Sequence, residues 1–175
     1  MSQKLPIEID PFRLARNKLI LEGDLALATM KRLLPSLANN DGNVHVKMNF
    51  DLEKVTGAAH MNGVFTTSLS LLCERCSKPV AYDININCSL GLVSNESEIE
   101  RLAEQYDPWL IESADPIKLS LIVEDELILA LPLVAKHNEI CLPKEVWQVG
   151  EEEVVVEEKK APSPFAMLAS LKTNK

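Results

Sequence analysis

The chain has 175 residues, of which 46% are hydrophobic and 25% are charged, and its formal net charge is -8 at pH 7. This size admits one domain with appendages and a sizeable hydrophobic core. No stretch reaches the roughly 18 uncharged apolar residues of a membrane helix, and the first residues contain no apolar signal core. We therefore expect a cytoplasmic protein, and its acidic surface excludes general clamping of nucleic acid.

The negative charge is unevenly distributed along the chain. Residues 91–140 carry 11 acidic and 3 basic side chains, whereas residues 1–50 carry 7 basic and 5 acidic ones. Because like charges repel, the acidic segment should avoid phosphate groups, while the mildly basic N-terminal part can approach them.

The first 42 residues predict short elements. Residues 5–9 are typical of a strand, and Asp10 followed by Pro11 indicates the start of a helical turn. A second helix is expected over residues 24–34, and the polar residues 39–42 indicate a turn.

Three strands with alternating apolar and polar residues are expected next, over residues 44–52, 65–73 and 80–92. Such alternation indicates a sheet with one buried and one wet face, which favours an antiparallel meander. Residues 62–63, Asn-Gly, are typical of a bulge or tight turn.

The remainder of the chain predicts helices and then an extended end. Residues 94–107 are compatible with an acidic helix, and residues 115–131 predict a strong helix that is apolar all round and largely buried. The fold class is therefore α+β: an antiparallel β-meander, open or barrel-like, packed against a buried helix, with a flexible C-terminal tail. We expect a globular domain at residues 1–142, an acidic, Pro-containing linker at 143–163 and an amphipathic motif at 164–175.

Cys73 and Cys76 form a Cys-x-x-Cys motif between two expected strands. This spacing lets both sulfurs face one metal ion and forms half of a zinc knuckle. His137 and Cys141 are the reasonable remaining ligands, although their spacing is equally compatible with accident. In the alternative without a cofactor, the two thiols of the motif only pack against the protein. A thiol-redox role is the less favoured alternative, because redox pairs usually lie at a helix N-terminus.

Glu124, Asp125 and Glu126 are consecutive on the apolar helix and project in three directions about 100° apart. At least one carboxylate should therefore meet a buried or partner-facing environment. A carboxylate satisfied by Arg75 or by a backbone cap is favoured over an acid–base or metal-binding pair, which would make a hydrolase. No Gly-rich phosphate loop, Ser-His-Asp set or two-His helix motif accompanies the trio, so we expect no enzyme.

The C-terminal motif places Phe165, Leu168 and Leu171 three residues apart, as on one side of a short helix. An apolar end after a polar linker should dock either on the chain's own body or in the groove of a partner.

Three segments together resemble one known family: residues 72–76 (LCERC), 123–132 (VEDELILALP) and 164–172 (PFAMLASLK). Their order and spacing are similar to those of the bacterial YceD proteins, large ribosomal RNA subunit accumulation proteins, and the likeness runs over residues 5–172. Ser77 stands where relatives often have Gly. Some relatives carry a second cysteine pair near Cys141, which stands alone here and weakens the metal interpretation.

The resemblance implies a non-enzymatic role in the synthesis, processing or stability of 23S ribosomal RNA during assembly of the large ribosomal subunit. The partner would be this RNA or its precursor particle, bound directly or through a ribosomal or assembly protein. The resemblance implies no membrane and no small-molecule substrate. The candidates for RNA contact are Arg13, Arg16, Lys18, Lys31, Arg32, Arg75 and Lys78. The acidic segment could instead meet a basic ribosomal protein.

Overall fold

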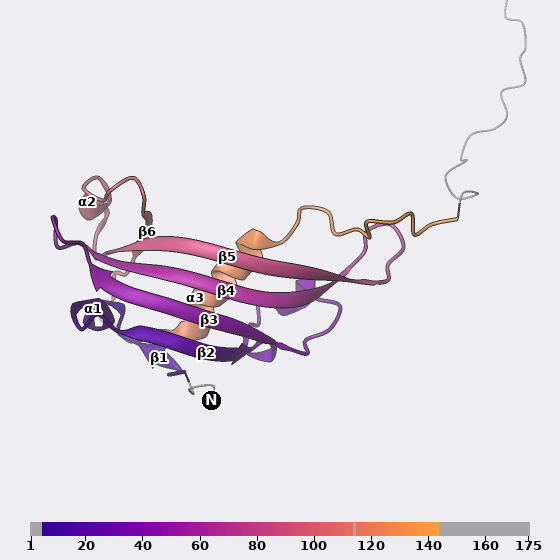
Figure 1. Cartoon of the computed structure of the whole chain (residues 1–175), viewed down its shortest axis with the longest axis horizontal. Helices are drawn as coiled ribbons and strands as arrows, with labels where there is room; N and C mark the ends of the chain where they lie inside the picture. Colours follow the sequence, from indigo (N-terminus) through magenta and orange to yellow (C-terminus); the bar gives the residue numbers. More distant parts are fainter. Residues whose placement is uncertain (1–4, 114, 144–175) are drawn as a thin grey trace, which may run out of the picture. The chain divides into compact units, whose positions relative to one another are not determined.

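The computed structural model describes residues 5–113 and 115–143. The described residues up to Cys141 form one compact α+β unit, built on a five-stranded sheet of order β2-β3-β4-β5-β6 and a pair of strands, β1 and β7 (Figure 1). The strands are β1 Glu8–Ile9, β2 Ile20–Ala26, β3 Asn43–Leu52, β4 Ala59–Leu72, β5 Pro79–Val93, β6 Asp107–Leu110 and β7 Ile117–Lys118. The helices are α1 Pro11–Arg16, α2 Glu96–Ile99 and α3 Leu119–Ala130, with short 3-10 turns η1 Leu27–Thr29 and η2 Leu34–Ser36.

Strands β2 to β5 form an antiparallel meander, and β6 pairs in parallel with β5. On β3, the side chains of Val44, Val46, Met48 and Phe50 are buried, while the residues between them are exposed. The alternation in the sequence thus corresponds to one buried face, and the expected α+β meander is confirmed. The sheet is open, with β2 and β6 as its edges, so the barrel-like alternative is not realised in the described residues.

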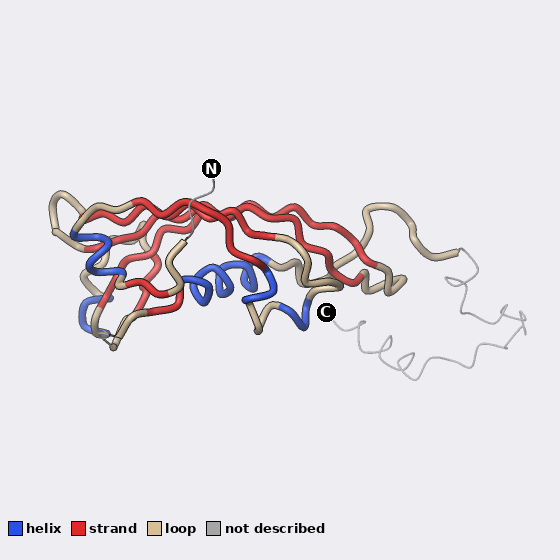
Figure 2. Tube along the Cα trace, turned by 90° about the horizontal axis from the view of Figure 1, so that it is seen from below, coloured by secondary structure: helices blue, strands red, loops and turns tan. Residues whose placement is uncertain are grey.

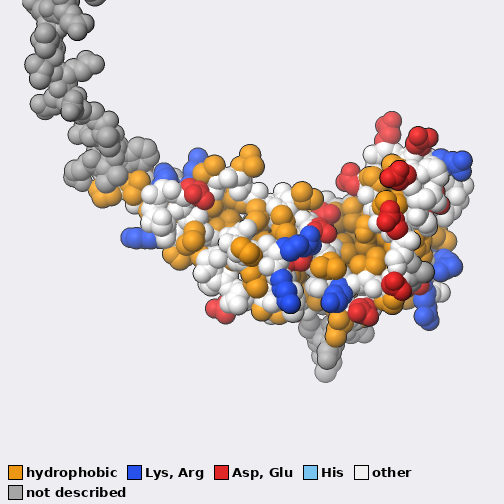
Figure 3. All heavy atoms as spheres, turned by 180° about the vertical axis from the view of Figure 1, so that it is seen from behind, with side chains coloured by type: hydrophobic (Ala, Val, Ile, Leu, Met, Phe, Trp, Pro, Cys, Tyr) orange, Lys and Arg blue, Asp and Glu red, His pale blue; other side chains and the backbone are white. Residues whose placement is uncertain are grey.

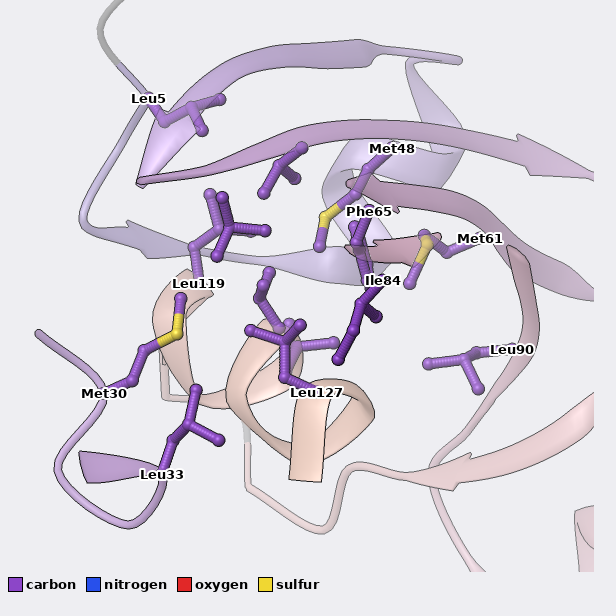
Figure 4. Packing of buried hydrophobic residues seen from close by; sticks show 14 of the residues in the cluster. Leu5, Met30, Leu33, Met48, Met61, Phe65, Ile84, Leu90, Leu119 and Leu127 are labelled. Atoms are coloured by element: carbon purple, nitrogen blue, oxygen red, sulfur yellow. The ribbon is translucent and has the colours of Figure 1, made fainter. Parts of the chain in front are cut away.

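Helix α3 lies against the buried face of the sheet (Figure 2). Leu119 and Leu127 point from this helix toward the sheet, where Phe65 is fully buried (Figure 4). Met30 and Leu33, from the segment between β2 and β3, close the core beside the helix. Each such side chain stabilises the fold by about 1.5–3 kcal/mol relative to exposure.

Helix α3 is shorter and less buried than its sequence suggests. It begins at Leu119 rather than near residue 115, because Ile117–Lys118 pair with β1 instead of joining the helix. Its outer face exposes Leu121 and Leu129, the latter at 79%. The prediction of a largely buried helix was therefore right for one face only.

The N-terminal predictions were partly right. Asp10 caps α1 as expected, since its Oδ1 accepts the N–H of Arg13 at 3.0 Å. The expected helix over residues 24–34 is wrong: Ile20–Ala26 is strand β2, followed by η1. Tertiary pairing with β3 overrides the helical propensity of this leucine-rich stretch. Residues 39–42 lie in the loop before β3.

Two further expectations were wrong. Gly63 lies in the uninterrupted ladder of β4, opposite Met48 and Cys88, and forms no bulge or turn. Residues 94–107 hold only the four-residue helix α2, and Asp107 already begins β6.

None of the helices in the described part of the chain is both long enough and apolar enough to span a bilayer.

Candidate functional site

The turn between β4 and β5 holds the Cys-x-x-Cys motif. The N–H of Ser77 donates to the carbonyl of Cys73 at 2.8 Å, and the N–H of Cys73 donates to the carbonyl of Lys78 at 2.9 Å. Ser77 has a φ of 54°, the left-handed conformation that closes such a tight turn. The turn therefore brings the two cysteines to one end of the sheet, as their position between strands predicted.

The segment that follows α3 returns to this turn. The N–H of Glu74 donates to the carbonyl of Ala135 at 2.8 Å, and the hydroxyl of Tyr82 bonds both the carbonyl and the N–H of Lys136 at 2.9 Å. The guanidinium of Arg75 donates to the carbonyls of His137 and Glu139. These contacts place His137 and Cys141 next to the two cysteines of the turn.

Cys73, Cys76, His137 and Cys141 form one cluster in which a ligand atom of each lies within 4.8 Å of the others. The Sγ atoms of Cys73 and Cys141 are 3.7 Å apart, and Sγ of Cys76 lies 3.5 Å from Nδ1 of His137. Cys73 is buried and the other three are half-buried. The four residues that the sequence singled out as metal ligands are thus together in space.

The thiols of this cluster differ in acidity. Burial opposes ionisation of Cys73, but hydrogen bonds from the backbone of His137, Cys76 and Arg75 outweigh it and lower the pKa of Cys73 to about 5. Burial and hydrogen bonds to the other two thiols raise the pKa of Cys141. Three thiols and an imidazole can bind a soft metal ion or exchange as thiol and disulfide.

Cys88 lies apart from this cluster, on β5 beside Gly63. Its side chain packs against the core, and burial, with the charge of Glu126, raises its pKa to about 12. Cys88 therefore has a structural role at the core and is not part of the cluster.

The carboxylate of Glu124 is held inside the protein. Its Oε1 accepts the N–H groups of Arg32 at 2.5 Å and Leu33 at 3.2 Å, and its Oε2 lies 3.3 Å from Nε of Arg32. The favoured interpretation of a satisfied buried carboxylate is confirmed, with Arg32 and a backbone cap as partners instead of Arg75.

The two neighbouring carboxylates are less enclosed. Asp125 is exposed and pairs with Arg32 at 2.6 Å, and this hydrogen bond raises the pKa of the arginine. Glu126 is half-buried, and burial, followed by repulsion from Asp107 and Asp125, raises its pKa.

The basic candidates fall into two groups. Arg13, Arg16, Lys31 and Lys78 are exposed and form no ion pair within the described residues. The other three bind the protein itself: Lys18 pairs with Asp51 at 2.9 Å, Arg32 with Glu124 and Asp125, and Arg75 with two backbone carbonyls.

A cavity of about 850 Å³ between α1 and the residues around α2 was not foreseen from the sequence. Its charged lining includes Arg16 and Arg101 together with Asp10, Glu98 and Asp115. Arg101 belongs to the acidic segment, so local charge gave no reason to single it out. Both signs of charge line the cavity, and they select no ligand class.

The face that carries α3 shows a division of charge. Acidic side chains gather around α2 at one end, while apolar side chains with scattered Lys and Arg occupy the middle (Figure 3). Exposed apolar residues on α3 and just after it include Leu129, Leu133 and Val134. The tail candidates Phe165, Leu168 and Leu171, and residues 144–163 of the expected linker, lie outside the described residues.

Fold and site define an α+β protein with a Cys3His cluster at one end of an open sheet. The model of the family described as "Large ribosomal RNA subunit accumulation protein YceD" matches residues 61–172. A relative from Haemophilus influenzae with the same name is 34% identical over 175 residues, which cover 97% of each chain. This chain therefore belongs to the YceD family, and the resemblance found in its three motifs is confirmed. No solved structure matches the chain.

Proposed function

We propose that this protein supports the accumulation of large-subunit ribosomal RNA in the cytoplasm as a binding factor without a catalytic step. The observation that carries this proposal is membership of the YceD family over almost the whole chain, since the relative is named for that role. Synthesis, processing and stability of 23S ribosomal RNA are the steps at which such a factor can act.

A binding role is supported by the environment of the acidic trio. A general acid or base needs a carboxylate that can reach a substrate. The oxygens of Glu124 instead accept hydrogen bonds from Arg32 and Leu33, and the side chain is buried. Asp125 is committed to the same arginine. Glu124 and Asp125 therefore stabilise the protein through Arg32, which disfavours the alternative of a carboxylate hydrolase.

Direct RNA contact is best supported at α1. Arg13 and Arg16 lie three residues apart on this helix, and positions with that spacing share a helix face. Both are exposed and unpaired within the described residues. Lys31 and Lys78 offer single contacts elsewhere. Arg32 and Arg75 would have to give up intramolecular bonds to bind phosphate, so their contribution to RNA binding is secondary.

The acidic side chains around α2 favour a second, protein-mediated contact. Glu96, Glu98, Glu100 and Glu104 lie in or near this short helix. Such a surface repels phosphate and complements a basic ribosomal protein. RNA contact is therefore local at α1, or is relayed through a basic partner.

The test is complementation of a deletion strain, with the ratio of 23S to 16S ribosomal RNA as the readout. Wild-type protein should restore the ratio that deletion lowers. Arg13→Glu with Arg16→Glu should fail to restore it if RNA is bound at α1. The matched control is Lys54→Glu with Lys118→Glu, which changes the same charge at two other exposed positions. A normal ratio of 23S to 16S ribosomal RNA in the deletion strain itself would contradict the proposed function.

A further inference from the structure

The structure assigns a structural zinc site to Cys73, Cys76, His137 and Cys141, in which one Zn²⁺ fastens the β4–β5 turn to the segment after α3. The four residues come from two parts of the chain, since 61 positions separate Cys76 from His137. Nothing in this inference depends on the proposed role in ribosomal RNA accumulation.

Two of the separations between ligand atoms match a tetrahedral zinc ion, and all four atoms lie within 4.8 Å of one another. With Zn–S near 2.3 Å and Zn–N near 2.0–2.1 Å, tetrahedral geometry places two sulfurs about 3.8 Å apart and a sulfur and a nitrogen about 3.5 Å apart. The Cys73–Cys141 pair is at 3.7 Å and the Cys76–His137 pair at 3.5 Å. Four thiolate and imidazole ligands around one centre select zinc over oxygen-seeking ions such as Mg²⁺ or Ca²⁺.

The surroundings of the cluster supply the support that zinc ligands usually receive. Nε2 of His137 lies 3.2 Å from the carbonyl oxygen of Pro79, so a proton on Nε2 leaves Nδ1 free to bind the metal. The guanidinium of Arg75 donates to the carbonyls of His137 and Glu139 and holds that loop in place. Its positive charge also offsets the excess negative charge of three thiolates on one divalent ion.

Binding requires no oxidant or reductant. The three thiols lose their protons to solvent, and three Zn–S bonds and one Zn–N bond form. All four coordination positions are then filled by the protein, which is typical of a structural site rather than a catalytic one. A disulfide between Cys73 and Cys141 would need the sulfurs at about 2.0 Å and would leave Cys76 and His137 without a role.

The first test is the metal content of the full-length protein, purified without chelators. We expect about one zinc per chain, as a single tetrahedral site requires. Cys88→Ser removes a cysteine outside the cluster and should retain that zinc, whereas Cys141→Ser should lose most of it. Folded wild-type protein that stays metal-free after incubation with zinc would overturn the assignment. So would an intact mass lower by two hydrogens, because it would show a disulfide.

A second test uses wild-type protein alone and does not depend on how the variants fold. Cobalt added to the apo-protein should give the intense visible and thiolate charge-transfer bands of a tetrahedral sulfur-rich site. Removing zinc should speed amide exchange at residues 73–78 and 135–141 more than in the centre of β3. Cobalt spectra typical of octahedral oxygen ligands, or exchange that zinc leaves unchanged, would contradict the site. Both measurements are independent of ribosomal RNA levels, so either hypothesis can fail without the other.

Discussion

The buried carboxylate of Glu124 and the backbone N–H of Arg32 form a 2.5 Å hydrogen bond between residues 92 positions apart. Glu124 is 2% exposed, yet it belongs to the middle of the most acidic part of the chain. The bond ties α3 to the segment between β2 and β3, which closes the core beside the sheet. It therefore makes a carboxylate of the acidic trio part of the fold.

Removing this carboxylate should destabilise the protein strongly. Glu124→Ala leaves the part-buried N–H of Arg32 and the buried N–H of Leu33 without their acceptor, and each such loss costs about 1–3 kcal/mol. Asp125→Asn, at the exposed neighbour, should cost less than about 1 kcal/mol. Chemical denaturation of the two variants measures the difference. Equal stability of Glu124→Ala and wild type, with lost 23S accumulation, would instead give Glu124 a functional role.

Ser77→Gly should stabilise the β4–β5 turn. A non-glycine residue in the left-handed conformation costs about 1–2 kcal/mol, and Ser77 has a φ of 54°. Ser68→Gly, in the interior of β4, should have the opposite effect, because glycine weakens a strand. Thermal unfolding that shifts in the same direction for both variants would refute this explanation.

Gly63→Ala should destabilise the sheet by about 1–3 kcal/mol through overpacking. A Cβ atom at this position would lie 2.7 Å from Sγ of Cys88 and 2.8 Å from Cζ of Phe65. Cys88→Ala should recover part of the loss in the double variant, because it removes the sulfur that clashes. Urea denaturation of the two single variants and the double variant provides the cycle. Strictly additive effects would show that the two positions do not compete for space.

Glu126→Gln should stabilise the protein at neutral pH. Burial and two nearby carboxylates raise the pKa of Glu126 in the folded state, so the folded protein holds this proton more tightly than the unfolded chain. Stability contributed by that proton is present at low pH and is lost as pH rises through the folded-state pKa. The gain from glutamine should therefore grow with pH and stay below about 1 kcal/mol, since the side chain is half-exposed.

The control for this titration is Glu100→Gln, which removes an equal charge at an exposed position. Unfolding free energies of both variants and the wild type, measured across the acidic and neutral range, separate burial from overall charge. A gain that is the same at every pH, or equal for the two variants, would contradict the role of burial.

Periodicity predicted the centre of the fold but not its edges. The alternation in β3, β4 and β5 identified the meander, because each strand has one buried face. In β2, Leu21, Gly23 and Leu25 share the less exposed face, but the strand ends in residues 24–26, which also begin the leucine-rich segment 24–34 that predicts a helix. Strand β1, Glu8–Ile9, lies within the strand expected over residues 5–9. Strands β6 and β7 have two to four residues and exist through pairing with β5 and β1, which no local pattern reveals.

The sequence predicted which residues form the candidate site, but not how they come together in space. The spacing of Cys73 and Cys76 indicated half of a metal site, and His137 and Cys141 followed by elimination. Their convergence depends on Arg75, Tyr82 and Glu74, which bond the backbone of the segment after α3. Those contacts form only once the sheet and α3 are assembled. Likewise, nothing in the sequence distinguished Arg32, which binds Glu124, from the unpaired cations.

The proposed role of this protein is to maintain large-subunit ribosomal RNA. Its most direct test is the amount of 23S relative to 16S ribosomal RNA in cells that lack the chain, with and without a plasmid copy of the wild type. Cells that lack the chain should have a lowered ratio, which the plasmid restores. A ratio that is unchanged by deletion, at equal growth rate and temperature, would contradict it.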